Sequence, residues 1–542
     1  MKGKRGAALT LAALAASGFF AGCSVPGQTG NAAGSQTAGN GAQDEEGSGT
    51  IPGGPTVTYW CELNDNVSAL YQNLGDTPFA RGLMENTGVN IVFRHPPAGQ
   101  TDEQFSMLMA GGDLPDVMEY AWTQYPGGPE KAISDGKIIA LNDVIDAYCP
   151  NLKAYLESHP EVDRQCKTDE GHYYMFPFIR GDQDLTLSSG LWIRQDWLDE
   201  LGLSMPETID EWHTVLTAFR DKKGCTAPFT YEYNMSELTE TLPFQYAFNT
   251  VKTFYVGDDG EVHFGPAEEN YRAFLETMHQ WYEEGLIDPD IATQQLDQVS
   301  AKVVSGQSGA SAGWTGSRAG VWMTEALKSN PGFNLQPAPV PTLVKGDTPA
   351  MGQMDNLVTS NGGVAITTGC RDYGTAARLL DWGYSEEGHM YYNFGTEGVS
   401  YTVQDGEPVY TDEVLKNPDG LPAAQAMSAY IRGNYNGPFV QDLRYLKQYY
   451  VYDGQKKAND TWYVQDASKH LLPPITPTAA ESVEFSSIMN EINAYRDDMT
   501  LQFILGTVDL NEFDDFIETL EEKGIERALE IENAALQRYN AR

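Results

Sequence analysis

The sequence predicts an α/β protein with at least two lobes. Beyond residue 55, short β-rich runs alternate with longer amphipathic segments, which is the pattern of strands and helices packed in α/β layers. Without its first 22 residues the chain still has about 520 residues, more than one ordinary hydrophobic core holds. We therefore expect the strands and helices to divide between two or more lobes.

Residues 1–22 have the features of an export signal peptide. A basic start is followed by an apolar run from Ala7 to Gly22, shorter than the ~20 residues that a membrane-spanning helix needs. The sequence Ala21-Gly22-Cys23 resembles a bacterial lipobox, although Phe20 stands where leucine is usual. We expect cleavage before Cys23 and attachment of a diacylglycerol to its thiol. The alternative is an ordinary secretory signal in which this cysteine is incidental.

Residues 24–55 are expected to form a disordered tether. Almost all of them are Gly, Ser, Thr, Asn, Gln, Ala or Pro, so they lack the apolar residues that would offset their ordering entropy. As a coil, about 30 such residues span roughly 30 Å. With Cys23 lipidated, the segment 23–55 would hold a globular body away from a membrane.

The first elements of the globular part are two strands with a helix between them. Residues 55–60 (PTVTYW) and 114–122 (LPDVMEYAW) are β-rich. Residues 103–111 (EQFSMLMAG) have the apolar spacing of a helix and end in glycine.

The clearest helix lies at residues 207–221. Thr208 and Glu211 have the spacing of a capping box at its start. An apolar stripe follows, which we interpret as core packing and not as a ligand-stacking surface; its members are Trp212, Val215, Leu216 and Phe219.

The C-terminal stretch 509–540 is expected to form two helices. Asp509 and Glu512 would cap the first of them, and Gly524 would separate it from the second.

The composition argues against nucleic acid as a partner. The formal net charge is −41, and binding of nucleic acid relies on Lys and Arg that neutralise phosphate. The electrostatic field of this negative charge also disfavours long polyanionic ligands, although we expect most of the charge to serve solubility alone. Beyond the export signal, no window is apolar enough to span a membrane.

No metal or cofactor is expected from the cysteines and histidines. The chain has no CxxC and no HxxxH pattern, so a zinc site has no support. Apart from Cys23, the cysteines are expected to be buried free thiols, with a bond between Cys149 and Cys166 as the alternative. Residues 258–261 (DDGE) resemble part of a calcium loop, but their spacing does not match an EF-hand, and a tight turn is the better interpretation.

Enzyme motifs are also missing. The sequence contains no GxSxG, HExxH, GxxxxGK[ST] or GxGxxG. A glycosidase needs only two opposed carboxylates, so motifs alone do not exclude one.

Five stretches together resemble the extracellular solute-binding proteins of ABC importers, in the large carbohydrate-associated group (family 1). Their order behind a lipobox and a tether carries the resemblance, which covers most of residues 56–542. The stretches are MAGGDLPDVMEY (109–120), GLWIRQDWLDELGLSMPETIDEW (190–212), MHQWYEEGLIDPD (278–290), GCRDYGTAARLLDWGYSEEGHMYYNFGTEGVSYT (369–402) and the two-helix tail that ends in ALQRYN (509–540).

The resemblance implies a two-lobed type 2 periplasmic binding-protein fold, with an interlobe cleft and a hinge. Lobe I would take residues 56–184 and 360–425, and lobe II residues 185–355. Residues 426–542, with the C-terminal helices, would belong mostly to lobe II, although no pattern places 426–475 well.

The resemblance further implies a membrane-anchored, extracellular receptor that is a monomer and passes an oligosaccharide to a separate ABC permease. Because the chain has no P-loop, the ATPase would also be a separate chain.

Candidate ligand residues follow the predicted strands, because ligands of open α/β sheets bind beyond the carboxyl ends of strands. Aromatic rings would stack on sugar faces, and amide and guanidinium groups would pair with hydroxyls. Each aromatic taken singly has core packing as its alternative role. The candidates are Trp60, Asn64, Trp122, Gln124, Arg180, Trp314, Arg318 and Tyr401.

Other functions of the same fold remain open at this point. They are a receptor for peptides or other small solutes, a cell-surface enzyme acting on glycans, and a surface sensor without a permease.

Overall fold

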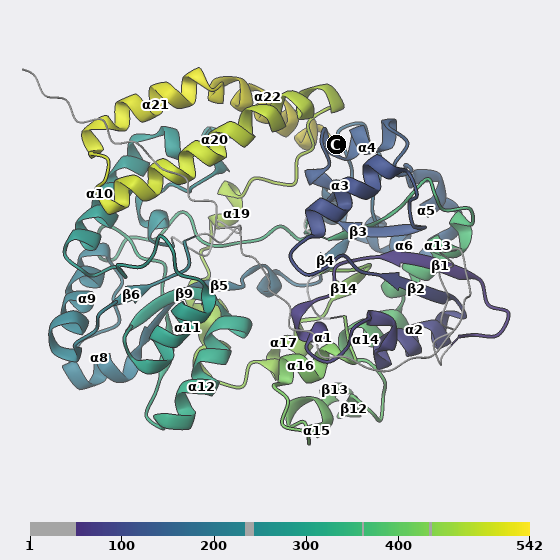
Figure 1. Ribbon diagram of the computed structural model, residues 1–542, viewed down its shortest axis with the longest axis horizontal. Helices are drawn as coiled ribbons and strands as arrows, with labels where there is room; N and C mark the ends of the chain where they lie inside the picture. Colours follow the sequence, from purple (N-terminus) through teal and green to yellow (C-terminus); the bar gives the residue numbers. More distant parts are fainter. Residues whose placement is uncertain (1–49, 234–242, 360–361, 433–435) are drawn as a thin grey trace, which may run out of the picture. The chain divides into compact units, whose positions relative to one another are not determined.

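The computed structural model describes residues 50–233, 243–359, 362–432 and 436–542 (Figure 1). The export signal, Cys23 and most of the 23–55 tether lie outside the described residues. None of the helices in the described part has the length and apolar content of a membrane-spanning segment.

The first of two four-stranded sheets has the order β11-β3-β1-β2. β1 (Thr56–Trp60) is parallel to β2 (Asn90–Arg94) and β3 (Val117–Tyr120), while β11 (Gly363–Ile366) runs antiparallel to β3. α3 (Thr101–Gly111) lies between β2 and β3 in sequence. The two strands and the helix expected here are thereby confirmed. We call this sheet and its core the first lobe.

The second sheet has the order β10-β5-β9-β6. β5 (Ser189–Arg194) is antiparallel to both β9 (Ala310–Trp314) and β10 (Leu335–Ala338), and β6 (Phe229–Thr230) is parallel to β9. A separate hydrophobic core, distinct from that of the first lobe, surrounds this sheet. We call this sheet and its core the second lobe.

The expected helix at 207–221 is α9 (Ile209–Lys223), and its start differs in one detail from a capping box. The Thr208 hydroxyl accepts a hydrogen bond from Glu211 N at 3.2 Å, as expected. The Glu211 carboxylate, however, makes its close hydrogen bond with Glu207 N, at 2.9 Å, one residue before the expected partner Thr208 N. Trp212 is fully buried in the second-lobe core, as the stripe predicted.

Segments 181–188 and 339–357 connect the two lobes, and we call them the crossover segments. The first runs from β4 (Phe178–Arg180) to β5, and the second runs from β10 back towards the first lobe, where Val358 forms a bridge with Ile179.

The structure places the segment 426–475, for which no sequence pattern gave a position. β14 (Phe439–Gln441) pairs in parallel with β4, and Phe439 packs in the first-lobe core. α18 (Asp453–Trp462) then packs on the other lobe, where Trp462 meets Trp192 of β5 edge-on at 5.2 Å. This segment therefore divides between the two lobes.

Three helices close the chain and lie together in the yellow part of Figure 1: α20 (Ala479–Leu505), α21 (Phe513–Glu522) and α22 (Ile525–Ala541). The two helices expected after residue 509 are confirmed. Gly524 separates them with a φ of 97°, a left-handed conformation that favours glycine. The Asp509 side chain accepts from Asn511 N and caps the short 3₁₀ turn Leu510–Glu512 before α21.

The five cysteines of the described residues are buried free thiols, so Cys149 and Cys166 are not bonded to each other. Residues 258–261 form the tight turn between β7 (Phe254–Val256) and β8 (Val262–Phe264), as expected.

The other elements are β12 (Tyr401–Gln404), β13 (Glu407–Tyr410), α1 (Asp65–Ser68), α2 (Pro78–Thr87), α4 (Gly128–Ser134), α5 (Asn142–Tyr148), α6 (Pro150–Ser158), α7 (Pro160–Gln165), α8 (Gln195–Leu201), α10 (Glu269–Glu283), α11 (Leu296–Ser305), α12 (Val321–Ser329), α13 (Tyr373–Asp381), α14 (Glu386–Phe394), α15 (Asp412–Leu415), α16 (Ala423–Ser428), α17 (Leu443–Tyr449) and α19 (Ala467–His470).

Candidate ligand-binding site

Trp314 and Arg318 lie together where β9 ends in the second lobe. Trp314 is the last residue of β9, and the next residues form a π-helical turn, Thr315–Gly320. The Arg318 guanidinium carbon lies 5.3 Å from the centre of the Trp314 ring, and Nη2 donates to Glu232 Oε2 at 3.1 Å. Trp314 is half-buried, so its ring keeps an accessible surface. Single π-helical turns are frequent at functional sites.

A glycine in β9 permits this arrangement. A Cβ atom on Gly313 would lie 2.9 Å from Cγ of Arg318. Because carbon atoms do not approach that closely, a larger residue would displace the Arg318 stem from its place beside the strand. The small residues before Trp314 therefore have a local role: they let the arginine side chain fold back towards the tryptophan.

Tyr449 is a residue of this region that the sequence analysis missed. It is the last residue of α17, and its ring lies directly against the π-helical turn, since a Cβ on Gly316 would be 2.6 Å from Cε1 of Tyr449. The ring is half-buried. The aromatic run YLKQYY (445–450) was the available signal, but no local pattern connects it with residue 316.

Arg180 lies at the start of the first crossover segment. Its Nη1 donates to Leu185 O at 2.7 Å, and its Nη2 donates to Asp355 Oδ2 at 2.5 Å. Burial raises the pKa of the Asp355 carboxyl, although Arg180 and Gln353 act in the opposite direction. Gln353 Oε1 also accepts from Ser188 N at 2.8 Å. Arg180 thus ties the two crossover segments together.

A cavity of about 610 Å³ lies beside this pair. Its walls come from α6 and α7, both crossover segments, the stretch around α19, and α22. The residues with polar groups at its surface include Tyr155, His159, Arg180, Asp182, Asp355 and Lys469. Both crossover segments contribute to the cavity wall, so a rotation of one lobe against the other would change its shape.

Trp60 and Trp122 are core residues of the first lobe. Trp122 is fully buried, and its Nε1 donates to Met118 O at 3.3 Å. The ring of Phe105 meets Trp122 edge-on at 5.4 Å and lies 6.4 Å from Trp60. Because neighbouring side chains enclose both indoles, neither presents a ring face for stacking. Trp122 and Trp314 both lie at or just after the end of a strand, so this sequence pattern alone does not show which of the two rings is buried and which is accessible.

Asn64 and Gln124 lie near the carboxyl ends of β1 and β3, which are adjacent strands. Asn64 caps α1, accepting from Asn66 N at 2.8 Å, and remains half-buried. Gln124 ends a short 3₁₀ turn and is exposed. Both keep polar atoms accessible at this edge of the first lobe.

Tyr401 belongs to a third group. It begins β12, and its ring is buried at 5.8 Å from that of Phe394, in a small cluster that also contains Tyr445 and Tyr450. Among the eight candidates, the structure therefore shows direct contact between Trp314 and Arg318. It buries the rings of Trp60, Trp122 and Tyr401, and it also buries most of the Arg180 and Arg318 side chains.

Comparisons with known proteins agree over most of the chain. A model of the family described as "Bacterial extracellular solute-binding protein" matches residues 63–390. The fructooligosaccharide ABC transporter substrate-binding protein FusA of Streptococcus pneumoniae is 26% identical over 489 residues, which are 85% of this chain and 86% of FusA. Lipoprotein LipO of Bacillus subtilis is 23% identical over 83% of this chain and 86% of LipO.

Solved structures match as well. The alginate-binding protein AlgQ2 superposes with a TM-score of 0.73 at 25% identity, covering 90% of this chain and 99% of AlgQ2. An ABC-transporter-associated solute-binding protein of Bifidobacterium longum infantis, described as HMO-binding, has a TM-score of 0.72 at 19% identity with the same coverage, and shows the fold alone.

Proposed function

Because this chain belongs to the family of bacterial extracellular solute-binding proteins, we propose that it captures an oligosaccharide and delivers it to a separate ABC permease. The observation that carries the proposal is similarity over most of the chain to FusA, named a fructooligosaccharide substrate-binding protein, and to AlgQ2, named an alginate-binding protein. FusA and AlgQ2 each match at least 85% of this chain. The two-lobed α/β fold is the one these proteins share.

We place the ligand between the lobes, with Trp314, Arg318 and Tyr449 on one side and Asn64 and Gln124 on the other. The half-buried rings offer flat apolar area to the C–H face of a sugar, and the amide and guanidinium groups offer hydrogen bonds to its hydroxyls. Trp60, Trp122 and Tyr401 are left out because their rings are enclosed.

The preferred ligand is a neutral or weakly charged oligosaccharide. The chain carries a net charge of −41, which opposes polyanions. Its two candidate arginines are each paired with a carboxylate of the chain itself, Arg180 with Asp355 and Arg318 with Glu232. Those pairs reduce the positive charge available to a uronate.

The protein would work outside the cell, held by a lipid on Cys23 and raised on the 23–55 tether. Support comes from the lipobox-like sequence and from the relative LipO, which is named a lipoprotein. Ligand binding would favour closure of the first lobe on the second lobe. Only the closed state lets both lobes touch the ligand.

Isothermal calorimetry on the protein, with neutral oligosaccharides and with uronate oligomers of equal length, tests this proposal. We expect binding of at least one neutral oligosaccharide and weaker binding of the uronates. A thermal-shift screen can choose the panel, since a ligand at 100 times its Kd adds ~2.7 kcal/mol of stability.

Three outcomes would contradict the proposal. Binding of peptides without binding of any glycan would indicate a peptide receptor. Release of reducing sugars from the oligosaccharides would indicate an enzyme. Tighter binding of uronates at physiological salt would overturn the preference for neutral ligands.

A further inference from the structure

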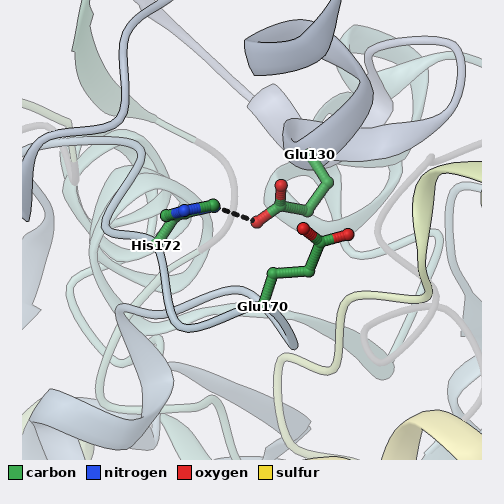
Figure 2. Close-up of side chains that lie close together, drawn as sticks. All are labelled: Glu130, Glu170 and His172. Atoms are coloured by element: carbon green, nitrogen blue, oxygen red, sulfur yellow. Dashed lines mark hydrogen bonds and ion pairs between the residues drawn. The ribbon is translucent and has the colours of Figure 1, made fainter.

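Three side chains in the region of the first lobe are of types that can bind a metal ion, and they lie close together (Figure 2). None of them belongs to the proposed binding site. Glu130, Glu170 and His172 each offer one ligand atom, and these atoms all lie within 4.8 Å of one another. His172 Nδ1 lies 2.9 Å from Glu130 Oε1. Among the described residues, no second group of three such side chains is found.

The fold brings these residues together from two separate segments. Glu130 is in the first turn of α4, while Glu170 and His172 belong to a tight hairpin closed by a bridge between Lys167 and Tyr173. Gly171 makes the hairpin turn with a φ of 83°. The two segments are about 40 residues apart in the sequence, so no local sequence motif predicts the cluster.

Glu130 is a buried carboxylate without a permanent positive partner. Its residue is 4% exposed, yet no lysine or arginine among the described residues forms an ion pair with it. Its Oε1 accepts from the Thr168 hydroxyl and contacts His172, while its Oε2 makes no hydrogen bond within the described part of the chain. Buried charges in proteins are normally paired or bound to metals. The exposed Glu170 adds a second negative charge, and within the group only a protonated His172 could supply a positive charge.

We propose that Glu130, Glu170 and His172 bind a divalent zinc ion. One imidazole and two carboxylates form a ligand set suited to zinc, with water as the fourth ligand. Calcium takes six to eight oxygen ligands, and magnesium requires octahedral oxygen coordination, so both fit this group poorly. Thr168 supports the site, since its hydroxyl donates to Glu130 and accepts from His172 N at 3.2 Å.

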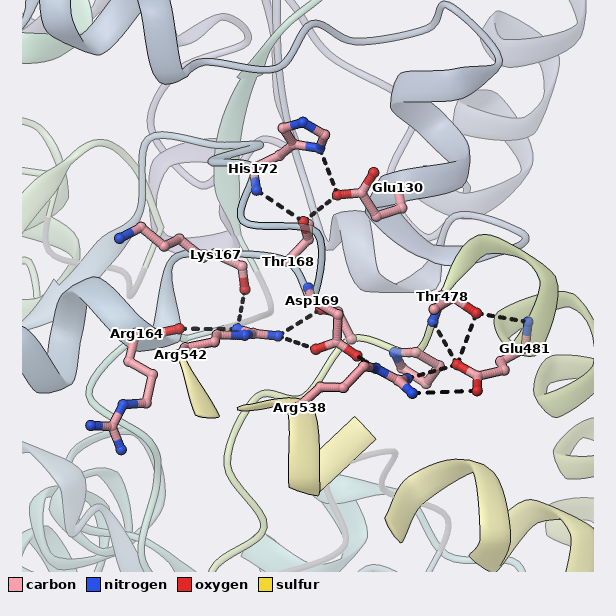
Figure 3. A network of polar contacts seen from close by, with 12 residues as sticks. Glu130, Arg164, Lys167, Thr168, Asp169, His172, Thr478, Glu481, Arg538 and Arg542 are labelled. Carbon is pink, nitrogen blue, oxygen red and sulfur yellow. Dashed lines mark hydrogen bonds and ion pairs between the residues drawn. The ribbon is translucent and has the colours of Figure 1, made fainter. Parts of the chain in front are cut away.

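The site adjoins the contact that anchors the end of the chain (Figure 3). Asp169, next to Glu170, accepts hydrogen bonds from Arg538 Nε at 2.5 Å and from Arg542 Nη2. Its own N–H donates to the Thr476 hydroxyl at 3.1 Å. Bound zinc would fix the hairpin against α4, and thereby fix the residue that holds the end of α22. Zinc binding should therefore also stabilise the folded protein.

Calorimetry with zinc chloride on the protein, after removal of metals with EDTA and dialysis, tests the site. We expect one zinc ion per chain, and a loss of affinity of about tenfold or more in His172→Gln and in Glu170→Gln. We choose His172, which is half-buried, and Glu170, which is exposed, because changes at these positions leave the buried packing intact. Zinc should also raise the melting temperature of the unaltered protein and leave that of His172→Gln unchanged.

The matched control is His213→Gln. His213 pairs with Glu284 at 2.6 Å between Nε2 and Oε2, so it is a histidine–glutamate pair without a third ligand. This variant should bind zinc as the unaltered protein does. The inference is overturned if zinc chloride gives no binding, if His172→Gln and Glu170→Gln bind zinc undiminished, or if calcium chloride binds more tightly than zinc.

Discussion

At the scale of single residues, two tryptophans with similar sequence surroundings have different roles. Trp314 ends β9 with a half-buried ring and an arginine beside it, while Trp122 follows β3 and is fully buried. The difference depends on what covers the strand end. In the first lobe, Phe105 and Tyr120 pack around Trp122, whereas in the second lobe the π-helical turn leaves Trp314 partly uncovered.

Alanine substitutions should separate these roles. Trp314→Ala removes from the binding site an aromatic face on which the sugar would stack. We expect the free energy of binding to weaken by ~0.5–1.5 kcal/mol in addition to the loss from the smaller contact area, so that affinity falls several-fold to tenfold. The melting temperature should change little. Trp122→Ala leaves a cavity in a core and should destabilise the fold by ~3–5 kcal/mol. Calorimetry and thermal denaturation of both variants check this. Unchanged glycan affinity in Trp314→Ala would remove this residue from the site.

His263 provides a pH-dependent contribution to stability. Its Nδ1 lies 2.9 Å from Glu268 Oε1 and its Nε2 lies 3.1 Å from Asp259. Burial alone would lower the pKa of His263, but hydrogen bonds with Asp259 and Glu268, together with their charges, raise it above its ordinary value.

The direction of the effect follows from that raised pKa. The protonated imidazole, hydrogen-bonded to both carboxylates, stabilises the folded state. This stabilisation is fully present below the ordinary histidine pKa of about 6.5, and it is lost as the pH rises through the pKa of His263 in the folded state. His263→Gln should therefore lower the melting temperature more at pH ~5.5 than at pH ~9. An equal loss at both values would show that the imidazole charge contributes nothing.

At the scale of elements, contacts between segments distant in sequence decide which helix belongs to which sheet. α18 comes late in the chain, but it packs on β10 of the second lobe, and its Trp462 meets Trp192 of β5. Gly190 of β5 makes this approach possible, because a Cβ there would lie 2.3 Å from Cε2 of Trp462.

Gly190→Ala should accordingly destabilise the protein by ~1–3 kcal/mol, since neither the backbone of β5 nor the buried indole of Trp462 has room to shift. Chemical denaturation measures the change. Gly111→Ala is the matched control, because nothing lies within 4 Å of a Cβ at this helical position. There alanine should be neutral or stabilising. Equal stability of the two variants would mean that α18 is not held closely against β5.

At the scale of the whole molecule, the proposed function requires the protein to remain at the cell surface. The described residues include no helix suited to crossing a membrane. The anchor that we propose is the lipid on Cys23, and its support is the lipobox-like sequence Ala21-Gly22-Cys23.

Cys23→Ser should prevent lipidation, because a hydroxyl does not replace the thiol that receives the diacylglycerol. Metabolic labelling with a fatty-acid analogue measures this directly, and fractionation should find the variant no longer retained as a lipid-anchored protein. Undiminished labelling in Cys23→Ser would show that Cys23 is not the anchor.

The sequence by itself determined the features that depend on neighbouring residues. The Thr208 cap, the buried stripe around Trp212, the break at Gly524 and the turn at 258–261 all depend on local backbone preferences and on periodic burial, and each appears in the structure. The order of its motifs also sufficed to indicate the family.

Only the tertiary structure decided which side chains lie together. The enclosed ring of Trp122, the contact of Tyr449 with residue 316, and the grouping of Glu130 with His172 each join segments that no local pattern connects. The physical reason is that burial and charge environment depend on everything packed around a residue, whereas sequence patterns report only on its neighbours along the chain.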